Sequence, residues 1–266
     1  MGPVRVGNAA FHQVQHDAYG QIILSSAQAF FDRRLFRPAN ADDFTALERV
    51  GERAVNRFDQ PDAGLWEFRT RESVHTYSAA MCWAGADRLA HIAERIGFDE
   101  RAQYWSRTAA RLHETISREA WDNKAGRFGA TFGSDDLDAS LLQLVDLHFV
   151  RADDPKFLAT FAAVEKGLRR GDQLLRYATE DDFGLPKTAF NFCTFWLIEA
   201  LHLVGRTDEA RDLYEETLRR LTPAGLLSED ADFDSGELWG NYPQTYSLVG
   251  LINCAVMLSR PWSSVR

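Results

Sequence analysis

The sequence predicts an all-α fold, built as an array of helical hairpins. Apolar residues recur at spacings of three and four along most of the chain, and no stretch shows the two-residue alternation of a half-buried strand. Mostly apolar segments are followed by amphipathic ones, and the couplet returns every roughly 50 to 65 residues, as in repeated helical hairpins. We therefore expect inner helices that are buried and outer helices that are half exposed.

The first four helices are expected before residue 122. The first is apolar after a polar start, and the second follows a break at Arg37-Pro38, with Asn40 as its N-cap. The third is rich in Ala, Met, Cys and Trp, which suits an inner position, whereas the fourth is amphipathic. These predicted helices span residues 12–31, 41–58, 78–97 and 100–121.

Five more helices continue the alternation of apolar and amphipathic segments. The apolar ones are expected to be inner helices, and the amphipathic ones, the first of which begins at Pro155, to be outer helices. They span residues 137–150, 155–168, 189–204, 207–221 and 244–259.

Length, charge and cysteine usage restrict the class of protein. With 266 residues, 45% of them hydrophobic, the chain can bury a large core, and we expect a single domain over residues 1–266. A net charge of −9 argues against a nucleic acid or a membrane surface as partner. Three cysteines at wide spacing suit reduced core thiols. Without a signal peptide or a long apolar run, the chain is predicted to be soluble and cytoplasmic.

The connections between helices differ in length. Turns from an inner to an outer helix are short, whereas the four returning connections are long and contain most of the unusual residues. In a double ring of antiparallel hairpins these long loops emerge on one face, which is usually the working face. They span residues 60–77, 122–136, 171–188 and 222–243.

Two of these loops combine carboxylates with aromatic side chains. Residues 224–247 contain Glu229 close to Trp239, and residues 61–71 contain Glu67 directly after Trp66. Sugars stack on aromatic faces, and glycosidic hydrolysis needs two carboxyl groups. The aromatic neighbours of Glu67 favour a protonated general acid, whereas the more polar loop of Glu229 favours an ionised general base. The alternative is that both glutamates are solvated loop acids.

Two acidic clusters and one polar helix start allow alternative readings. Asp135, Asp136 and Asp138 either ligate a divalent metal or cap the next helix, and residues 180–182 (Glu-Asp-Asp) allow the same choice. The polar residues of segment 12–17 either end the first helix at the surface or face a pocket. No serine lies on the strand-turn-helix elbow of a hydrolase triad.

At these loops the sequence resembles inverting glycoside hydrolases of the glucoamylase and bacterial trehalase type, glycoside hydrolase family 15. The motifs that carry the resemblance occur in order along almost the whole chain. They are PVRVGNAA, QVQHDAYG, GLWEFR, HTYSAAMCWAGADR, LDASLL, RYATEDDFG, AFNFCTFWLIEAL and GLLSEDADFDSGELWGNYPQTYS.

The resemblance implies an (α/α)6 toroid that releases β-glucose from the non-reducing end of an α-glucoside, without a metal or other cofactor. It implies that Glu67 is the general acid and Glu229 the general base, with Trp66 and Trp239 forming the sugar subsite. We also expect Arg69, Asp136 and Asp181 to bind substrate.

The chain also departs from this family. Relatives carry an N-terminal β-sandwich and further barrel helices, so we expect the C-terminal portion of a catalytic domain, with about nine of twelve helices. An open ring would expose apolar surface and favour self-association or a completing partner. Lys187 stands where relatives commonly have an acid, and Leu248 where a His is usual.

Two other functions remain open at this point. One is a non-catalytic or truncated helical remnant that binds carbohydrate and needs a partner for activity. The other is a metal-dependent cyclase or lyase that uses the Asp135 cluster.

Overall fold

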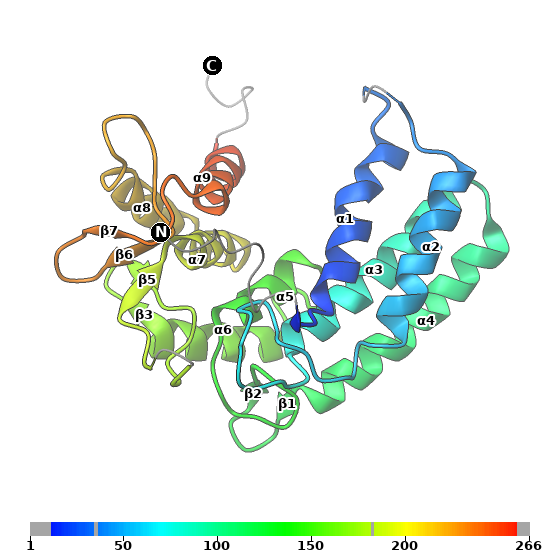
Figure 1. The fold of residues 1–266 in the computed structure, drawn as a ribbon, viewed down its shortest axis with the longest axis horizontal. Coiled ribbons are helices and arrows are strands. Elements are labelled where there is room, and N and C mark those ends of the chain that lie inside the picture. The colour runs from blue at the N-terminus through cyan, green and yellow to red at the C-terminus, as the bar shows by residue number, and fades with distance from the viewer. Residues whose placement is uncertain (1–11, 35–36, 182–183, 260–266) are drawn as a thin grey trace, which may run out of the picture. The chain divides into compact units, whose positions relative to one another are not determined.

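The computed structural model describes residues 12–34, 37–181 and 184–259, and these are mostly helical (Figure 1). Within these ranges the α-helices are α1 (Asp17–Phe31), α2 (Ala41–Val55), α3 (Thr76–Arg95), α4 (Asp99–Glu119), α5 (Gln143–Asp146), α6 (Pro155–Leu168), α7 (Asn191–Leu203), α8 (Thr207–Leu218) and α9 (Thr245–Leu258). A short 3-10 helix, η2 (Ala139–Leu142), precedes α5. The predicted all-α class is confirmed.

The strands are two or three residues long, which is too short to produce an alternating pattern in the sequence. They are β1 (Trp121–Asp122), β2 (Arg127–Phe128), β3 (Arg169–Arg170), β4 (Gln173–Leu174), β5 (Thr188–Phe190), β6 (Asp230–Asp232) and β7 (Leu238–Trp239). The sequence analysis therefore missed them.

The chain divides into two compact units. Unit 1 comprises Met1–Asp122, Gly129–Ser134 and Leu147–Phe149, and unit 2 comprises Asn123–Phe128, Asp135–Asp146 and Val150–Arg266. That they form the single domain expected from the sequence stays a prediction.

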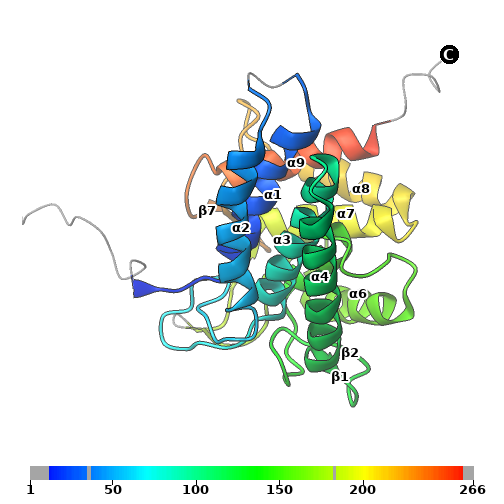
Figure 2. The ribbon, with the colours of Figure 1, turned by 90° about the vertical axis from the view of Figure 1, so that its right-hand side faces the viewer.

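In unit 1, α3 is the central helix and packs against α1, α2 and α4. Figure 2 shows the long α4 running beside α3. The apolar faces of these helices meet in a core of fully buried side chains, as the helical periodicity predicts. The largest of these are Ile23, Phe44, Leu89, Ile92, Trp105, Leu112 and Ile116.

The contact between α1 and α3 depends on small residues. A Cβ atom on Gly20 of α1 would lie 2.0 Å from the backbone oxygen of Met81 in α3, and one on Gly85 would lie 3.0 Å from Cδ1 of Ile23. Glycine at these positions lets the two backbones approach closely.

In unit 2, α7 is the central helix. It packs against α8, α9 and η2, and it directly follows the strand β5. The antiparallel sheet β5–β6–β7 pairs Phe190 with Asp230 and Asp230 with Trp239. Its ladder connects the start of α7 with the loop that contains Glu229.

Local capping explains where two of the helices begin. Asn40 accepts hydrogen bonds from the backbone of Asp42 (2.9 Å) and Asp43 (3.2 Å), and the Asp43 carboxylate accepts one from Asn40 N (2.9 Å). This capping box confirms the predicted N-cap. Asp154 caps α6, which begins with Pro155.

Two predicted helices differ clearly from the structure, whereas the others agree with it to within three residues at each end. The first begins at Asp17 instead of residue 12, because side chains of segment 13–16 bond to a loop far away in sequence. The predicted helix 137–150 is reduced to η2 and α5. One reason is His148, whose φ of 62° lies in the left-handed region and cannot continue a helix.

The predicted contrast between short and long connections is confirmed within the described residues. Three residues separate α3 from α4 and α7 from α8, whereas the connections from α2 to α3, α4 to η2, α6 to α7 and α8 to α9 are long and contain the acidic loops. The three cysteines, Cys82, Cys193 and Cys254, are free and buried. Among the described residues, no helix is both long and apolar enough to cross a membrane.

The last helix, α9, exposes an apolar face. Its large side chains Val249, Ile252 and Val256 are 47%, 60% and 72% exposed, and Tyr246 is 63% exposed. A cavity of about 480 Å³ lies between this face and α7, with Trp196 and Glu199 among its lining residues. Burial and the nearby carboxylate of Asp146 raise the pKa of Glu199 to about 7.

Candidate active site

The loop that contains Glu67 is folded by hydrogen bonds within unit 1. Asp62 and Ser73 form an antiparallel bridge, with Asp62 N to Ser73 O at 2.9 Å and Ser73 N to Asp62 O at 3.1 Å. Inside this bridge, Glu67 N donates to Gly64 O (3.2 Å), and Phe68 N donates to Ala63 O (3.0 Å). The result is a tight turn that presents Glu67 at its end.

The backbone of this turn is left-handed at two positions. Gly64 has a φ of 66°, and a Cβ there would lie 2.7 Å from the ring of His75, so only glycine fits. Glu67 has a φ of 58°, a conformation that residues with a Cβ rarely adopt. Such strain is typical of functional positions.

Aromatic contacts fix the next residue in the turn. The ring of Phe68 stacks on that of His75, with centroids 5.7 Å apart, and Arg71 Cζ lies 4.0 Å over the Phe68 ring. Phe68 is therefore buried beside the turn, whereas Glu67 and Arg69 are exposed and Trp66 is half-buried. All three predicted site residues of this loop are accessible to a ligand.

A buried polar cluster lies behind the turn, at the start of α1. Asp62 Oδ2 accepts hydrogen bonds from His16 N (2.7 Å) and Ser78 Oγ (2.8 Å), and the Cys82 thiol donates to His16 O (3.3 Å). His16, Asp17 and Asp62 are each 2% exposed or less. Of the two readings of the polar segment, exposure at the surface is thus wrong for His16 and Asp17.

Burial changes the protonation chemistry of this cluster. Burial first, and then the charge of Asp62, raise the pKa of Asp17 to about 6, and Glu67 adds to this effect. Burial lowers the pKa of His16, against the opposing charge of Asp62. Several buried atoms here have no hydrogen-bond partner among the described residues, namely Gln13 Oε1, both ring nitrogens of His16, Asp17 Oδ1 and Asp62 Oδ1. Ordered water or ligand hydroxyls normally satisfy such groups.

In unit 2, Glu229 directly precedes β6 and is half-buried. Its backbone is held on both sides, because Glu229 N donates to Asn241 O and Asn191 N donates to Glu229 O, each at 3.0 Å. Its Oε2 atom accepts hydrogen bonds from Asn241 N (3.0 Å) and Asn241 Nδ2 (2.9 Å). A Cβ on Gly240 would lie 2.7 Å from this oxygen, so the glycine leaves the space that the carboxylate occupies.

The residue before Glu229 anchors the loop to two helices. The carbonyl oxygen of Ser228 accepts hydrogen bonds from Asn191 Nδ2 of α7 (2.9 Å) and from Ser247 Oγ of α9 (2.8 Å). All three side chains are buried. The carboxylate of Glu229 thus stands on a rigid support.

Charged groups of both signs lie around Asp230, the residue after Glu229. Burial raises the pKa of Asp230 to about 6, with Glu229 adding to the rise and the Arg176 cation opposing it. Arg176 Nη2 lies 3.7 Å from Asp181 Oδ2, which also accepts a hydrogen bond from the Tyr177 hydroxyl (2.7 Å). The carboxylate of Asp181, only 6% exposed, is therefore anchored beside Arg176.

The acidic residues before η2 differ in burial. Asp138 is buried, forms a backbone bridge with Tyr177, and caps η2 by accepting a hydrogen bond from Ser140 N (2.8 Å). For Asp138 the capping interpretation is thus confirmed. Asp135 and Asp136 are exposed. Within the part of the chain that the structure describes, no three His, Cys, Asp or Glu side chains gather as metal ligands would.

Aromatic side chains lie near Glu229 in accessible positions. Trp239 on β7 is 54% exposed, and it pairs with Asp230 through the backbone. Tyr242 is 50% exposed. Trp239 is therefore accessible, and its role as a stacking surface stays a prediction.

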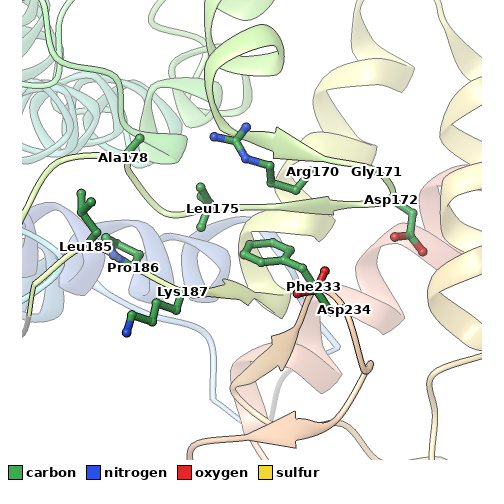
Figure 3. Close-up of a pocket in the computed structure, with 10 residues that line it drawn as sticks. All are labelled: Arg170, Gly171, Asp172, Leu175, Ala178, Leu185, Pro186, Lys187, Phe233 and Asp234. Carbon is green, nitrogen blue, oxygen red and sulfur yellow. The ribbon is translucent and has the colours of Figure 1, made fainter.

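A cavity of about 720 Å³ lies at the other end of the β5–β6 ladder from Glu229 (Figure 3). Phe233 and Lys187 line it together with Arg170 and Asp172 of the β3–β4 turn. The close-up shows charged groups of both signs around the ring of Phe233.

The structure adds residues that the sequence analysis missed. Arg176 lies beside Asp181, and Asn241 holds Glu229, although neither was predicted as a site residue. The RYATEDD motif contained Arg176, but only its acids were considered. The fold brings Asp138, Arg176 and Asp181 to one place in unit 2, while Asp182 lies outside the described residues.

Comparison with known proteins gives a consistent result. A protein-family model described as glycosyl hydrolases family 15 matches residues 1–256. The trehalase of Mycobacterium tuberculosis (strain H37Rv) is 36% identical over 261 residues, which cover 97% of this chain and 38% of that protein. The chain thus spans about two fifths of the length of this curated relative.

Solved structures show the same fold at lower identity. A glycosidase in complex with glucose matches 93% of this chain and 68% of its own chain, with a TM-score of 0.78 and 20% identity. A bacterial glucoamylase in complex with acarbose matches 92% of this chain and 41% of its own, with a TM-score of 0.69 and 16% identity. The helical hairpins are thus those of a glucoamylase-like (α/α)6 toroid.

Proposed function

Because the chain belongs to glycosyl hydrolases family 15, we propose that it contributes both catalytic carboxyl groups of an exo-acting, inverting α-glucoside hydrolase. Glu67 protonates the glycosidic oxygen, and Glu229 removes a proton from the attacking water. Water then adds to the anomeric carbon from the face opposite the leaving group, and β-glucose is released. Inversion needs the two carboxyl groups roughly 6.5 to 9.5 Å apart, with room for this water.

The observation that carries the proposal is that both glutamates are held by the backbone around them. Glu67 stands on a left-handed turn, and Oε2 of Glu229 is bound by two N–H groups of Asn241. These bonds orient the carboxylate. Pre-positioned groups of this kind are what general acid–base catalysis requires.

The sugar subsite is proposed from residues of the four long loops. Trp66 and Trp239 stack on sugar rings, and Arg69, Asp136 and Asp181 bind hydroxyl groups. We add Arg176, whose guanidinium lies beside Asp181 and Asp230. The M. tuberculosis relative is a trehalase, and solved neighbours hold glucose or acarbose, so an α-glucoside is the proposed substrate. No metal or other cofactor enters this mechanism.

The first test is proton NMR of the chain with maltotriose, isomaltose and trehalose, in which the anomer of the released glucose is followed. An inverting enzyme gives β-glucose first from maltotriose, and one α- and one β-glucose from trehalose. Glu67→Gln and Glu229→Gln should each lower kcat by about 10² to 10⁴-fold. Glu72→Gln and Glu237→Gln, exposed residues of the same loops, are the matched controls.

Three outcomes contradict parts of the proposal. Early release of α-glucose from maltotriose would show retention instead of inversion. Wild-type turnover in either Gln variant would show that the substituted glutamate does not have its proposed catalytic role. Saturable binding of glucosides without turnover, unchanged in Glu67→Gln, would favour the carbohydrate-binding alternative.

We further propose that the exposed face of α9 packs against a second copy of the chain. Three aliphatic residues of this face, Val249, Ile252 and Val256, are 47% to 72% exposed, which is unusual for contiguous apolar side chains. A cytoplasmic location, and the absence of nucleic-acid and membrane partners, stay predictions.

A further inference from the structure

Segment 13–16 of the chain runs beside the loop that contains Glu67. Ala63 N donates to Val14 O (2.8 Å), so the two backbones are joined at this point. The segment is anchored below by His16 N, which donates to the buried carboxylate of Asp62 (2.7 Å). Its side chains therefore reach the turn from a fixed base.

Two glutamine side chains of this segment hold both ends of the turn. Gln13 Nε2 donates to Glu67 O at 2.7 Å and lies 3.4 Å from Phe68 O. Gln15 Nε2 donates to Gly64 O at 3.0 Å. Both side-chain amides thus bond to the same turn, one near each of its ends.

The turn between these two bonds contains the strained residue. A φ of 58° in the backbone at Glu67 costs free energy because this residue carries a side chain. Such a conformation persists only where the surrounding residues hold it. Within the turn itself, Glu67 N bonds to Gly64 O at 3.2 Å, a long hydrogen bond. The two amide groups reach these carbonyl groups from outside the loop.

We propose that Gln13 and Gln15 are positioning residues, whose amides hold Glu67 in the left-handed conformation that aims its carboxyl group at the leaving oxygen. This inference rests on the proposed role of Glu67 as the general acid. Neither glutamine needs to touch the substrate. The effect on catalysis passes through the carbonyl groups of Gly64 and Glu67.

The first test compares leaving groups. Maltose needs a proton on its leaving oxygen, whereas α-glucosyl fluoride has a leaving group that departs with little acid assistance. Gln13→Leu and Gln15→Leu should lower kcat for maltose about 10-fold or more and leave kcat for the fluoride within about twofold. Glu67→Gln is the reference, with a larger loss on maltose and the same selectivity.

Gln60→Leu is the matched control, because its amide donates to Asn56 O (3.0 Å), four residues earlier in the chain. It should leave both substrates unaffected. Equal losses on maltose and fluoride in the Gln13 and Gln15 variants would indicate general structural damage and overturn the inference. If Glu67→Gln itself shows no selectivity for the leaving group, the proposed role of Glu67 fails instead.

The second test needs no turnover. Glycine tolerates a positive φ, so Glu67→Gly should raise the thermal midpoint in the wild-type background. In a Gln13→Leu/Gln15→Leu background the turn can relax, and the same substitution should give a smaller or no rise. Glycine also adds conformational entropy to the unfolded chain, but this effect is equal in both backgrounds. It therefore cancels when the two shifts in the thermal midpoint are compared. An equal shift in the two backgrounds would show that the glutamines do not hold the strain.

Discussion

Asp17 shows how burial alters one carboxyl group. Its pKa is about 6 in the folded chain and 3.8 as the ordinary value, so the folded state binds its proton more tightly than the unfolded state. The contribution of Asp17 to the free energy of unfolding is therefore fully present below pH 4, where the group is protonated in both states. It is lost as the pH rises through 6. At pH 8 the penalty is about 2 kcal/mol, at 1.36 kcal/mol per pKa unit with allowance for partial solvation.

Asp17→Asn should remove this penalty. Its free energy of unfolding relative to wild type should be higher by about 1 kcal/mol at pH 8 than at pH 4.5, because part of the penalty is already present at pH 4.5. Urea unfolding at the two pH values measures the difference. Asp208→Asn, at an exposed position of α8, is the control. A stability difference that does not change with pH would show that Asp17 is not protonated in the folded state near pH 5.

At the scale of single residues, the sequence predicted the loops better than the contacts. Glu67 and Glu229 stood out because carboxylates with aromatic neighbours on long loops are unusual. Arg176 and Asn241 did not, because their partners are set by the pairing of strands and loops. Segment 13–16 looked like part of a helix, since its tertiary hydrogen bonds to Asp62 and Gly64 leave no local signal.

Individual helices follow from periodicity where their packing is continuous. The capping box at Asn40 and the Pro155 start were readable directly, because both act within one turn of helix. The predicted helix 137–150 failed because the pattern of apolar residues does not record that Asp138 bridges to Tyr177 or that His148 is left-handed.

The α1–α3 contact makes a prediction at this scale. Alanine has the higher helix propensity, by about 1 kcal/mol, yet Gly20→Ala should destabilise the chain by about 1 to 3 kcal/mol. The reason is the Cβ position 2.0 Å from Met81 O, a backbone atom that cannot move aside. Denaturant unfolding measures the change.

Ser25→Ala on the same helix is the matched control. Ser25 is exposed, so the substitution should be neutral or slightly stabilising. A neutral Gly20→Ala variant would mean that α1 and α3 are farther apart than the structure places them.

For the whole molecule, the exposed face of α9 predicts association that depends on concentration. Ile252→Glu and Val256→Glu place charges at positions that are 60% and 72% exposed, so they should weaken self-association without lowering stability. Sedimentation velocity over a range of concentrations measures the first effect, and thermal unfolding the second.

Leu218→Glu, at an exposed leucine on α8, is the control and should not change association. A wild-type chain that stays monomeric at all concentrations would exclude the second copy as the occupant of this face. The sequence indicated an open edge from the count of helices. Which helix presents it could be seen only from the exposure of each side chain.

The three buried thiols have a practical consequence. Burial raises the pKa of Cys82, Cys193 and Cys254, and thiol reagents attack the accessible thiolate. Toward maleimide probes the folded chain therefore behaves as if it contained no cysteine. Cysteines introduced at the exposed positions Arg69 and Trp239 would carry a pair of spin labels without competition. The spacing of those labels would measure in solution how far the two glutamate loops lie from each other.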